Sequence, residues 1–298
     1  MSPLSGQAVR HCHHLLNILH STVYFSPDFD KELSGRGVDD PMGRYLAGRS
    51  AALGRVGPGV VTASFYSFQH AMVARHLPAV WDRVAPGEAL AARLRAADST
   101  LRRVLGEQTV TSRSMSDAAG LALRAAEAGV RPGRPLYAAH ADQPVPREPH
   151  LALWYAATLL REHRGDSHVA ALGAAGLDGL EALVSHSASD DGMPREVVMT
   201  KRGWTAEDWS AAEDRLRERG FMAADGSLTE QGRRMRRALE EDTDRRDRAP
   251  YEHLGEQGVA ELVALTADFV RTAAAAGAFP AELEGFFLGA VDTKNLRS

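Results

Sequence analysis

Apolar side chains recur along most of this chain at spacings of three, four and seven residues, the period of an amphipathic helix. In the segment 87–107, for example, Leu90, Leu94, Leu101 and Leu105 follow one another at intervals of 4, 7 and 4 residues. Only short stretches such as "GSLTE" at 226–230 resemble strands. The pattern predicts a mainly α-helical protein whose strands are limited to short β-wings.

A proline-rich segment interrupts the helical pattern. Residues 130–150 contain five prolines, and a helix cannot run through them. We therefore predict an N-terminal helical, winged-helix-like domain at 1–130, a linker at 131–149, a second domain at 150–255 and a helical tail at 256–298.

The predicted tail has one apolar face. Leu262, Leu265, Phe269 and Ala273 recur on it at spacings of 3, 4 and 4 residues. Such a face must be covered by the rest of the protein or by a second chain. We expect it to pack on the body, which favours a monomer and leaves a homodimer open.

The second domain contains the pattern of a helix-turn-helix. An apolar helix ends near Gly165, a short helix covers 169–174, and a turn at Gly176 leads into a third helix at 178–188. Two helices joined by a glycine-containing turn form the DNA-reading motif of many regulators.

A hairpin signal follows further along the chain. Asp225 and Gly226 lie between short apolar pieces, and Thr229 is suited to cap the next helix. The first half also resembles the second, because 51–67 aligns without gaps on 170–186. The sequence thus predicts tandem winged-helix-like domains and leaves their duplication open.

Several segments together resemble an actinobacterial family described as helix-turn-helix proteins. The matching pieces are "LHSTVYFSPDF" (19–29), "GRSAALG" with "VVTASFYSF" (48–68), "EPHLALWYAATLLREHRGDSHVAAL" (148–172), "RGWTAEDW" (202–209) and "LTEQGR" (228–233). The C-terminal half is also similar to the winged helix of MarR regulators, through Leu216, Arg219, Gly220, Asp225, Gly226, Leu228, Thr229 and Gly232. The resemblance implies the fold and leaves the chemistry open.

The charge distribution argues against sequence-specific DNA binding. The chain carries a net charge of −4, and no Lys or Arg occurs between Arg164 and Arg195. Residues 201–250 contain 12 basic and 12 acidic residues, so their difference is zero. Since affinity for DNA comes largely from neutralising phosphates, we predict weak binding. In the alternative, a ligand-responsive regulator of MarR type, the helix 178–188 would enter the major groove. The backbone contacts would then come from Arg233, Arg234, Arg236 and Arg237.

The composition is that of a cytoplasmic globular protein. Hydrophobic residues make up 44% and charged residues 25% of the chain. The single cysteine, Cys12, excludes an intrachain disulfide. No stretch reaches the roughly 18 apolar residues of a membrane helix, so we expect no membrane association.

Histidines provide the candidate catalytic groups. His163 and His168 lie five residues apart across Gly165, close to Glu162 and Asp166. A bend at Gly165 could turn both imidazoles inward, as an acid–base pair or as ligands to haem or a metal. In the alternative, they satisfy helix ends and are structural.

A short tract near the N-terminus also has the composition of a metal site. "HCHH" at 11–14 could hold a soft metal, although a frayed, solvated N-terminus explains it better. The metal and the cofactor, haem included, are left open.

Aromatic and histidine residues gather in a few segments and predict one small-molecule site. The ligand-binding candidates are His20, Tyr24, Phe65, Tyr66, His70, His150, Trp154 and Arg161. Mostly apolar pockets with a few polar groups are typical ligand sites, while a packed core without a cavity is the alternative.

The predicted function is therefore binding of a small molecule or cofactor between the two halves. An enzyme of specialised metabolism fits this function, and so does a non-catalytic self-resistance or carrier protein. The sequence contains no phosphate-binding glycine loop, nucleophile elbow or CxxC pair, which excludes the commonest nucleotide, hydrolase and zinc-ribbon classes. The DNA-binding regulator stays as a further alternative.

Overall fold

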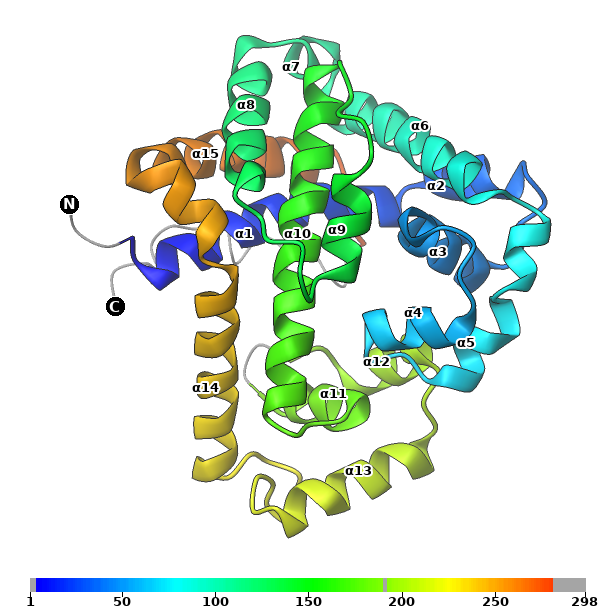
Figure 1. Cartoon of the computed structure of the whole chain (residues 1–298), viewed down its shortest axis with the longest axis vertical. Helices are drawn as coiled ribbons and strands as arrows, with labels where there is room; N and C mark the ends of the chain where they lie inside the picture. The colour runs from blue at the N-terminus through cyan, green and yellow to red at the C-terminus, as the bar shows by residue number, and fades with distance from the viewer. Residues whose placement is uncertain (1–3, 190–191, 281–298) are drawn as a thin grey trace. The chain divides into compact units, whose positions relative to one another are not determined.

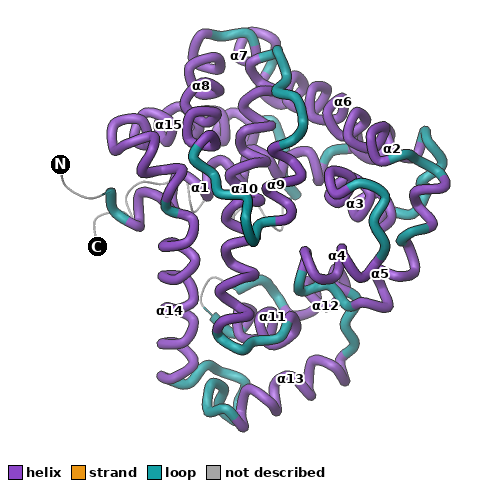
Figure 2. Tube along the Cα trace, viewed as in Figure 1, coloured by secondary structure: helices purple, strands orange, loops and turns teal. Residues whose placement is uncertain are grey.

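The structure, a computed structural model, describes residues 4–189 and 192–280. These residues form 15 α-helices and three short 3-10 helices, with no strand among them (Figure 2). The prediction of a mainly helical protein is confirmed. No helix in these ranges is both long and apolar enough to cross a membrane.

The predicted β-wings are wrong. Met222 and Leu228 form one isolated antiparallel bridge around the turn at Gly226, which has φ +84°. This bridge is the only strand-type pairing that the described residues form in the segment 219–229. The cap predicted at Thr229 is confirmed, because its hydroxyl accepts a hydrogen bond from the Gly232 amide at 3.0 Å.

The described residues divide into two compact units built from alternating stretches of chain. Unit 1 comprises the described parts of Met1–Arg55, Val80–Arg164 and Asp247–Ser298. Unit 2 comprises Val56–Ala79 and Gly165–Arg246. The proline-rich segment predicts consecutive domains instead. Consecutive domains are the simpler expectation when contacts between distant segments are unknown.

Unit 1 is a helical assembly. Its elements are α1 (Gly6–Ser21), η1 (Thr22–Phe25), α2 (Pro27–Ser34), α3 (Pro41–Ser50), η2 (Ala51–Leu53), η3 (Ala79–Asp82, from its second residue), α6 (Pro86–Leu105), α7 (Glu107–Val110), α8 (Arg113–Glu127), α9 (Pro135–Ala141), the first part of α10 (Pro149–Ala174) and α15 (Ala249–Ala275). Helix α9 lies within the predicted proline-rich linker, where Pro135 occupies the first turn and is compatible with a helix.

Helix α15 packs on α1 and α8, as Figure 1 shows. The buried face of α8 is mostly alanine, which lets the two helices approach closely. Leu262, Phe269 and Ala273 of the predicted apolar face are buried, whereas Leu265 is half-buried. The prediction that the tail packs on the body is confirmed for its described part, and 281–298 lie outside the described residues.

Unit 2 contains the remaining helices. They are α4 (Pro58–Phe65), α5 (His70–His76), the end of α10, α11 (Gly179–Ser187), α12 (Arg195–Arg202), α13 (Ala206–Glu218) and α14 (Glu230–Asp247, up to Arg246). Their core includes Trp209, Leu216, Leu180 and Val184.

Helix α10 corrects one sequence expectation. It is continuous from Pro149 to Ala174, so the predicted end near Gly165 and the separate short helix at 169–174 are wrong. A single glycine in a helix costs about 1 kcal/mol relative to alanine, too little to end a helix with buried side chains along its length. The turn predicted at Gly176 is confirmed, with φ +64°.

Helices α12 and α13 are joined by the kind of short turn found in helix-turn-helix motifs. Gly203 ends α12 in the left-handed conformation, at φ +79°. Thr205 then begins α13 through a reciprocal capping box with Asp208. The aligned stretches that suggested a duplication differ in structure: 51–53 form a 3-10 helix, while 170–173 belong to α10.

Candidate ligand-binding site

The predicted ligand-binding residues fall into both units. His20, Tyr24, His150, Trp154 and Arg161 belong to unit 1, whereas Phe65, Tyr66 and His70 belong to unit 2. The set therefore does not form one site within a single unit.

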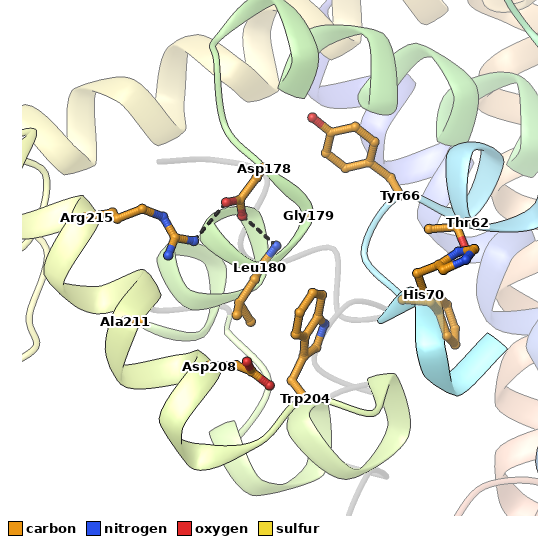
Figure 3. Close-up of a pocket in the computed structure, with 11 residues that line it drawn as sticks. Thr62, Tyr66, His70, Asp178, Gly179, Leu180, Trp204, Asp208, Ala211 and Arg215 are labelled. Atoms are coloured by element: carbon orange, nitrogen blue, oxygen red, sulfur yellow. Dashed lines mark hydrogen bonds and ion pairs between the residues drawn. The ribbon is translucent and has the colours of Figure 1, made fainter. Parts of the chain in front are cut away.

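Unit 2 contains a pocket of about 350 Å³ (Figure 3). Aromatic and imidazole side chains line it together with three charged ones. The former are Tyr66, Phe68, His70 and Trp204, and the latter are Asp178, Asp208 and Arg215. We refer to it as the unit 2 pocket.

The segment 56–79 forms one wall of this pocket and is attached by three hydrogen bonds, one to the turn before α11 and two to the α12–α13 region. The Tyr66 hydroxyl donates to the Leu177 carbonyl at 2.6 Å. The Trp204 indole donates to the Ser67 carbonyl at 2.9 Å, and the backbone N–H of Gln69 donates to the Arg202 carbonyl at 3.0 Å. The segment thus covers the turn that precedes α13.

The backbone at Tyr66 is strained. Its φ of +61° is the one positive φ at a non-glycine position in the described part of the chain. Its carbonyl lies so close to Gly179 that a Cβ there would be only 2.2 Å from the oxygen. Strain of this kind persists only where surrounding contacts impose it, and it is concentrated at functional sites.

The pocket carries a negative charge. The Arg215 guanidinium is already paired with Asp178 at 2.8 Å and with Glu181 at 3.2 Å. Hydrogen bonds from the Thr205 side chain and backbone lower the pKa of Asp208, so it is ionised at neutral pH. Both bonds end on Oδ2 of Asp208, and Oδ1 receives none from the described residues. Oδ1 is therefore available to a ligand.

The remaining predicted residues of unit 2 lie around this pocket. His70 Nδ1 is 3.0 Å from the Thr62 hydroxyl on one side of it. Burial, and then Asp178 and Glu181, raise the pKa of Tyr66, which keeps its hydroxyl protonated and able to donate. Phe65 is buried and packs edge to face on Phe68. Sequence reasoning missed Trp204 and Asp208, although "RGWTAEDW" was noted for its resemblance.

In unit 1, four of the five predicted residues lie together. The His20 ring stacks on Trp154 with centroids 4.9 Å apart and lies 5.6 Å from Tyr24. The Arg161 guanidinium lies 6.0 Å from the centre of the Tyr24 ring. His150 lies outside this group and contacts Asp98 at 2.6 Å.

The two predicted catalytic histidines belong to different units. His163 is fully buried in unit 1, with Nδ1 2.5 Å from Asp247 Oδ1, and its ring meets Tyr137 edge to face. His168 belongs to unit 2, where its Nδ1 lies 3.0 Å from the Thr243 hydroxyl. Their catalytic role stays a prediction, and these contacts are also those of structural residues.

The N-terminal tract lies on α1. Burial, together with Asp247, raises the pKa of the Cys12 thiol to about 12, so it is protonated at neutral pH. A thiol must lose its proton to bind a metal. Across the described residues, no group of three or more His, Cys, Asp and Glu side chains is arranged to hold a metal ion.

We take α13, rather than the helix predicted at 178–188 (α11), as the second helix of the helix-turn-helix, and its charge is unfavourable for reading DNA. The helix has five acidic and two basic residues, a difference of −3: Glu207, Asp208, Glu213, Asp214 and Glu218 against Arg215 and Arg217. Arg217 pairs with Glu213 and Asp214 on the same helix. Two of the acids are in the first turn, the end that contacts bases in such motifs.

The four arginines of the DNA-binding alternative lie on α14. Arg233, Arg234 and Arg237 are exposed and share Glu230 as an ion-pair partner. Arg236 is only 11% exposed and pairs with Glu240. An exposed group of three therefore remains available for phosphates.

The sequence model of a helix-turn-helix family matches residues 9–280. The chain belongs to this family, which agrees with the α12–α13 turn. Neither a curated protein nor a solved structure matches the chain.

Proposed function

We propose that the protein binds a small organic molecule in the unit 2 pocket, at a helix-turn-helix that no longer serves to read DNA. The observation that carries this proposal is the attachment of the segment 56–79 to the turn before α13. The Trp204 indole of that turn donates to the Ser67 carbonyl, and the carbonyl of Arg202, the last residue of α12, accepts from the backbone amide of Gln69. The Arg202 guanidinium also stacks on Phe68 at 4.1 Å.

The same attachment opposes DNA binding through α13. A recognition helix enters the major groove with its N-terminal residues facing the bases. Here that end adjoins the docked segment and carries Glu207 and Asp208. Both features would have to be reversed before this helix could contact a duplex.

The lining of the pocket suggests a flat ligand with an amino group. Trp204 and Tyr66 offer aromatic faces, and cations bind favourably over such rings. Oδ1 of Asp208 offers a charged acceptor beside Trp204 (Figure 3). Hydrogen bonds to a charged partner contribute about 1.5–3 kcal/mol. This contribution is enough to make the Kd of an amine lower than that of a neutral analogue by roughly tenfold or more.

We test the ligand class with 2-phenylethylamine and its neutral analogue 2-phenylethanol, measured by ligand-observed NMR. The amine should bind at least about tenfold more tightly. Asp208→Asn should remove this preference, because the amide has no charge. Asp214→Asn is the matched control, since Asp214 lies on the same helix, 65% exposed and paired with Arg217. Equal binding of the two probes, or a preference that survives Asp208→Asn, would contradict the proposal.

DNA binding is tested separately by fluorescence anisotropy with random and promoter duplexes at about 150 mM salt. We expect a Kd weaker than about 10⁻⁶ M, the tight end of the non-specific range. The double variant Arg233→Ala and Arg237→Ala should remove the residual binding to DNA, because both side chains are exposed and can reach phosphates. Nanomolar affinity for one promoter fragment would overturn this part of the proposal and favour the regulator.

A further inference from the structure

Unit 1 contains a buried group of charged and imidazole side chains that the proposed function does not use. Arginines and histidines from five helices contribute to it, and one carboxylate joins them. The members are His20 (α1), Arg49 (α3), Arg93 (α6), His140 (α9), and Glu162 and Arg161 (α10). We call this set the arginine cluster.

Arg93 is the unusual member. It is only 2% exposed, and no carboxylate among the described residues pairs with it. One terminal nitrogen contacts His20 Nε2 at 3.1 Å and donates to the Tyr24 hydroxyl at 3.0 Å, while the guanidinium lies 4.7 Å from the Trp154 ring centre. Its Nε is buried without a hydrogen-bond partner in the described chain.

The surrounding histidines do not compensate this charge. Burial, and then the neighbouring arginines, lower the pKa of His20 well below its ordinary value and that of His140 to about 3, so both rings are neutral. Nδ1 of His20 and Nε2 of His140 are also buried without a partner in the described residues. When Nε2 of His20 accepts from Arg93, its Nδ1 carries the proton and is a donor.

The cluster therefore has an excess of positive charge. Arg49, Arg93 and Arg161 supply three charges and Glu162 one opposite charge, which leaves +2. Glu162 is already engaged by Arg49 at 3.3 Å and by Arg161. Buried charges without a counter-charge are strongly unfavourable, and an unpartnered buried group often marks an ion or ligand site.

We infer that unit 1 binds an aromatic carboxylate at the arginine cluster, with its carboxylate on Arg93 and its ring beside Tyr24 and Trp154. A guanidinium holds a carboxylate with two parallel N–H donors: Nε of Arg93 is unused, and the terminal nitrogen beside it would exchange its contact with His20 or Tyr24 for the carboxylate. The cluster reaches the surface through half-buried side chains, because Tyr24 is intermediate in exposure and the Arg161 side chain is 21% exposed.

The test compares thermal unfolding of the full chain in benzoate, in its neutral isostere benzamide and in sodium chloride at the same concentration. Because a ligand that binds the folded state raises Tm, benzoate should raise it by a few degrees beyond the effect of either control. Titration calorimetry with benzoate should give saturable binding. An equal response to chloride or benzamide, or no response to benzoate, would overturn the inference.

Variants on one helix assign the site. Arg93→Met should abolish the benzoate shift and leave the unliganded Tm unchanged or raised, since it removes an uncompensated charge. Arg95→Met, at an exposed position paired with Glu32, should keep the full shift. Arg93→Lys retains the charge without the planar donor pair, so it should weaken benzoate binding about tenfold or more. A benzoate shift that persists in Arg93→Met and Arg93→Lys would refute the site.

This inference is independent of the unit 2 pocket. Asp208→Asn should leave benzoate binding intact, and Arg93→Met should leave 2-phenylethylamine binding intact. Each proposal can therefore fail without the other.

Discussion

Glu162→Gln should lower the free energy of unfolding by about 3–5 kcal/mol, the range observed when one partner of a buried ion pair is removed. Glu162 is fully buried between Arg49 and Arg161 and is the only carboxylate among the members of the arginine cluster. Without it, the cluster contains three guanidinium charges and no carboxylate among its members. Chemical denaturation followed by circular dichroism measures the change.

A matched control is available on the surface of the same unit. Glu107 pairs with Arg102 but is 68% exposed, so Glu107→Gln should change stability by no more than about 1 kcal/mol. If Glu162→Gln changes the free energy of unfolding by no more than about 1 kcal/mol, Glu162 does not stabilise the arginine cluster as a buried counter-charge. Adding Arg93→Met to Glu162→Gln should recover part of the loss, because it reduces the excess charge.

The same residue predicts the acid sensitivity of the protein. Burial opposes ionisation of Glu162, but the attraction of Arg49 and Arg161 outweighs it and lowers the pKa to about 2, from 4.5 in the unfolded chain. A lowered folded-state pKa stabilises the protein above pH 4.5, and this contribution is lost as the pH falls through 2. The stability of Glu162→Gln should therefore depend less on pH within this window.

The helical fold was predictable because its signals are local. Periodicity, the turn at Gly176 and the cap at Thr229 each depend on residues within a few positions of one another. The contacts among His20, Tyr24 and Trp154 were also predicted in part, because an aromatic and histidine set in a chain with few aromatics indicated that they gather.

Arg93 was missed because the leucine pattern of α6 pointed to a different face. Leu90 and Leu94 are half-buried, whereas Ala89, Arg93 and Ala97 lie on the buried face. Small alanines allow close helix packing, so in the first half of α6 they mark the interior, whereas Leu101 and Leu105 of the leucine pattern are buried in its second half. The available signal was the spacing, because Ala89 and Ala97 lie four residues before and after Arg93 and so share its helix face.

The unit 2 pocket could not be predicted, because it depends on a contact between distant segments. Tyr66 and Leu177 are 111 residues apart, and no local pattern pairs them. The predicted separation of the halves also placed 56–79 in the N-terminal domain, away from the helix-turn-helix that it covers.

Gly179→Ala should disrupt the unit 2 pocket, because the structure leaves no room for a side chain at this first residue of α11. An added Cβ would lie 2.2 Å from the Tyr66 carbonyl oxygen and 3.0 Å from its carbon, so the segment 56–79 must move. The movement would break the bonds of Tyr66 to Leu177 and of Trp204 to Ser67. We expect a loss of about 2–3 kcal/mol and no binding of 2-phenylethylamine.

Gly173→Ala provides the control for this variant, since nothing lies within 4 Å of an added Cβ at that position near the end of α10. Alanine is the better helix former, so this substitution should stabilise unit 2 by up to about 1 kcal/mol and leave ligand binding unchanged. Denaturation curves followed by tryptophan fluorescence report on both variants, because the Trp204 indole loses its hydrogen bond only when the segment moves. If Gly179→Ala is as stable as Gly173→Ala and still binds the amine, the docked segment does not form the pocket, and a ligand site in unit 2 must be sought elsewhere.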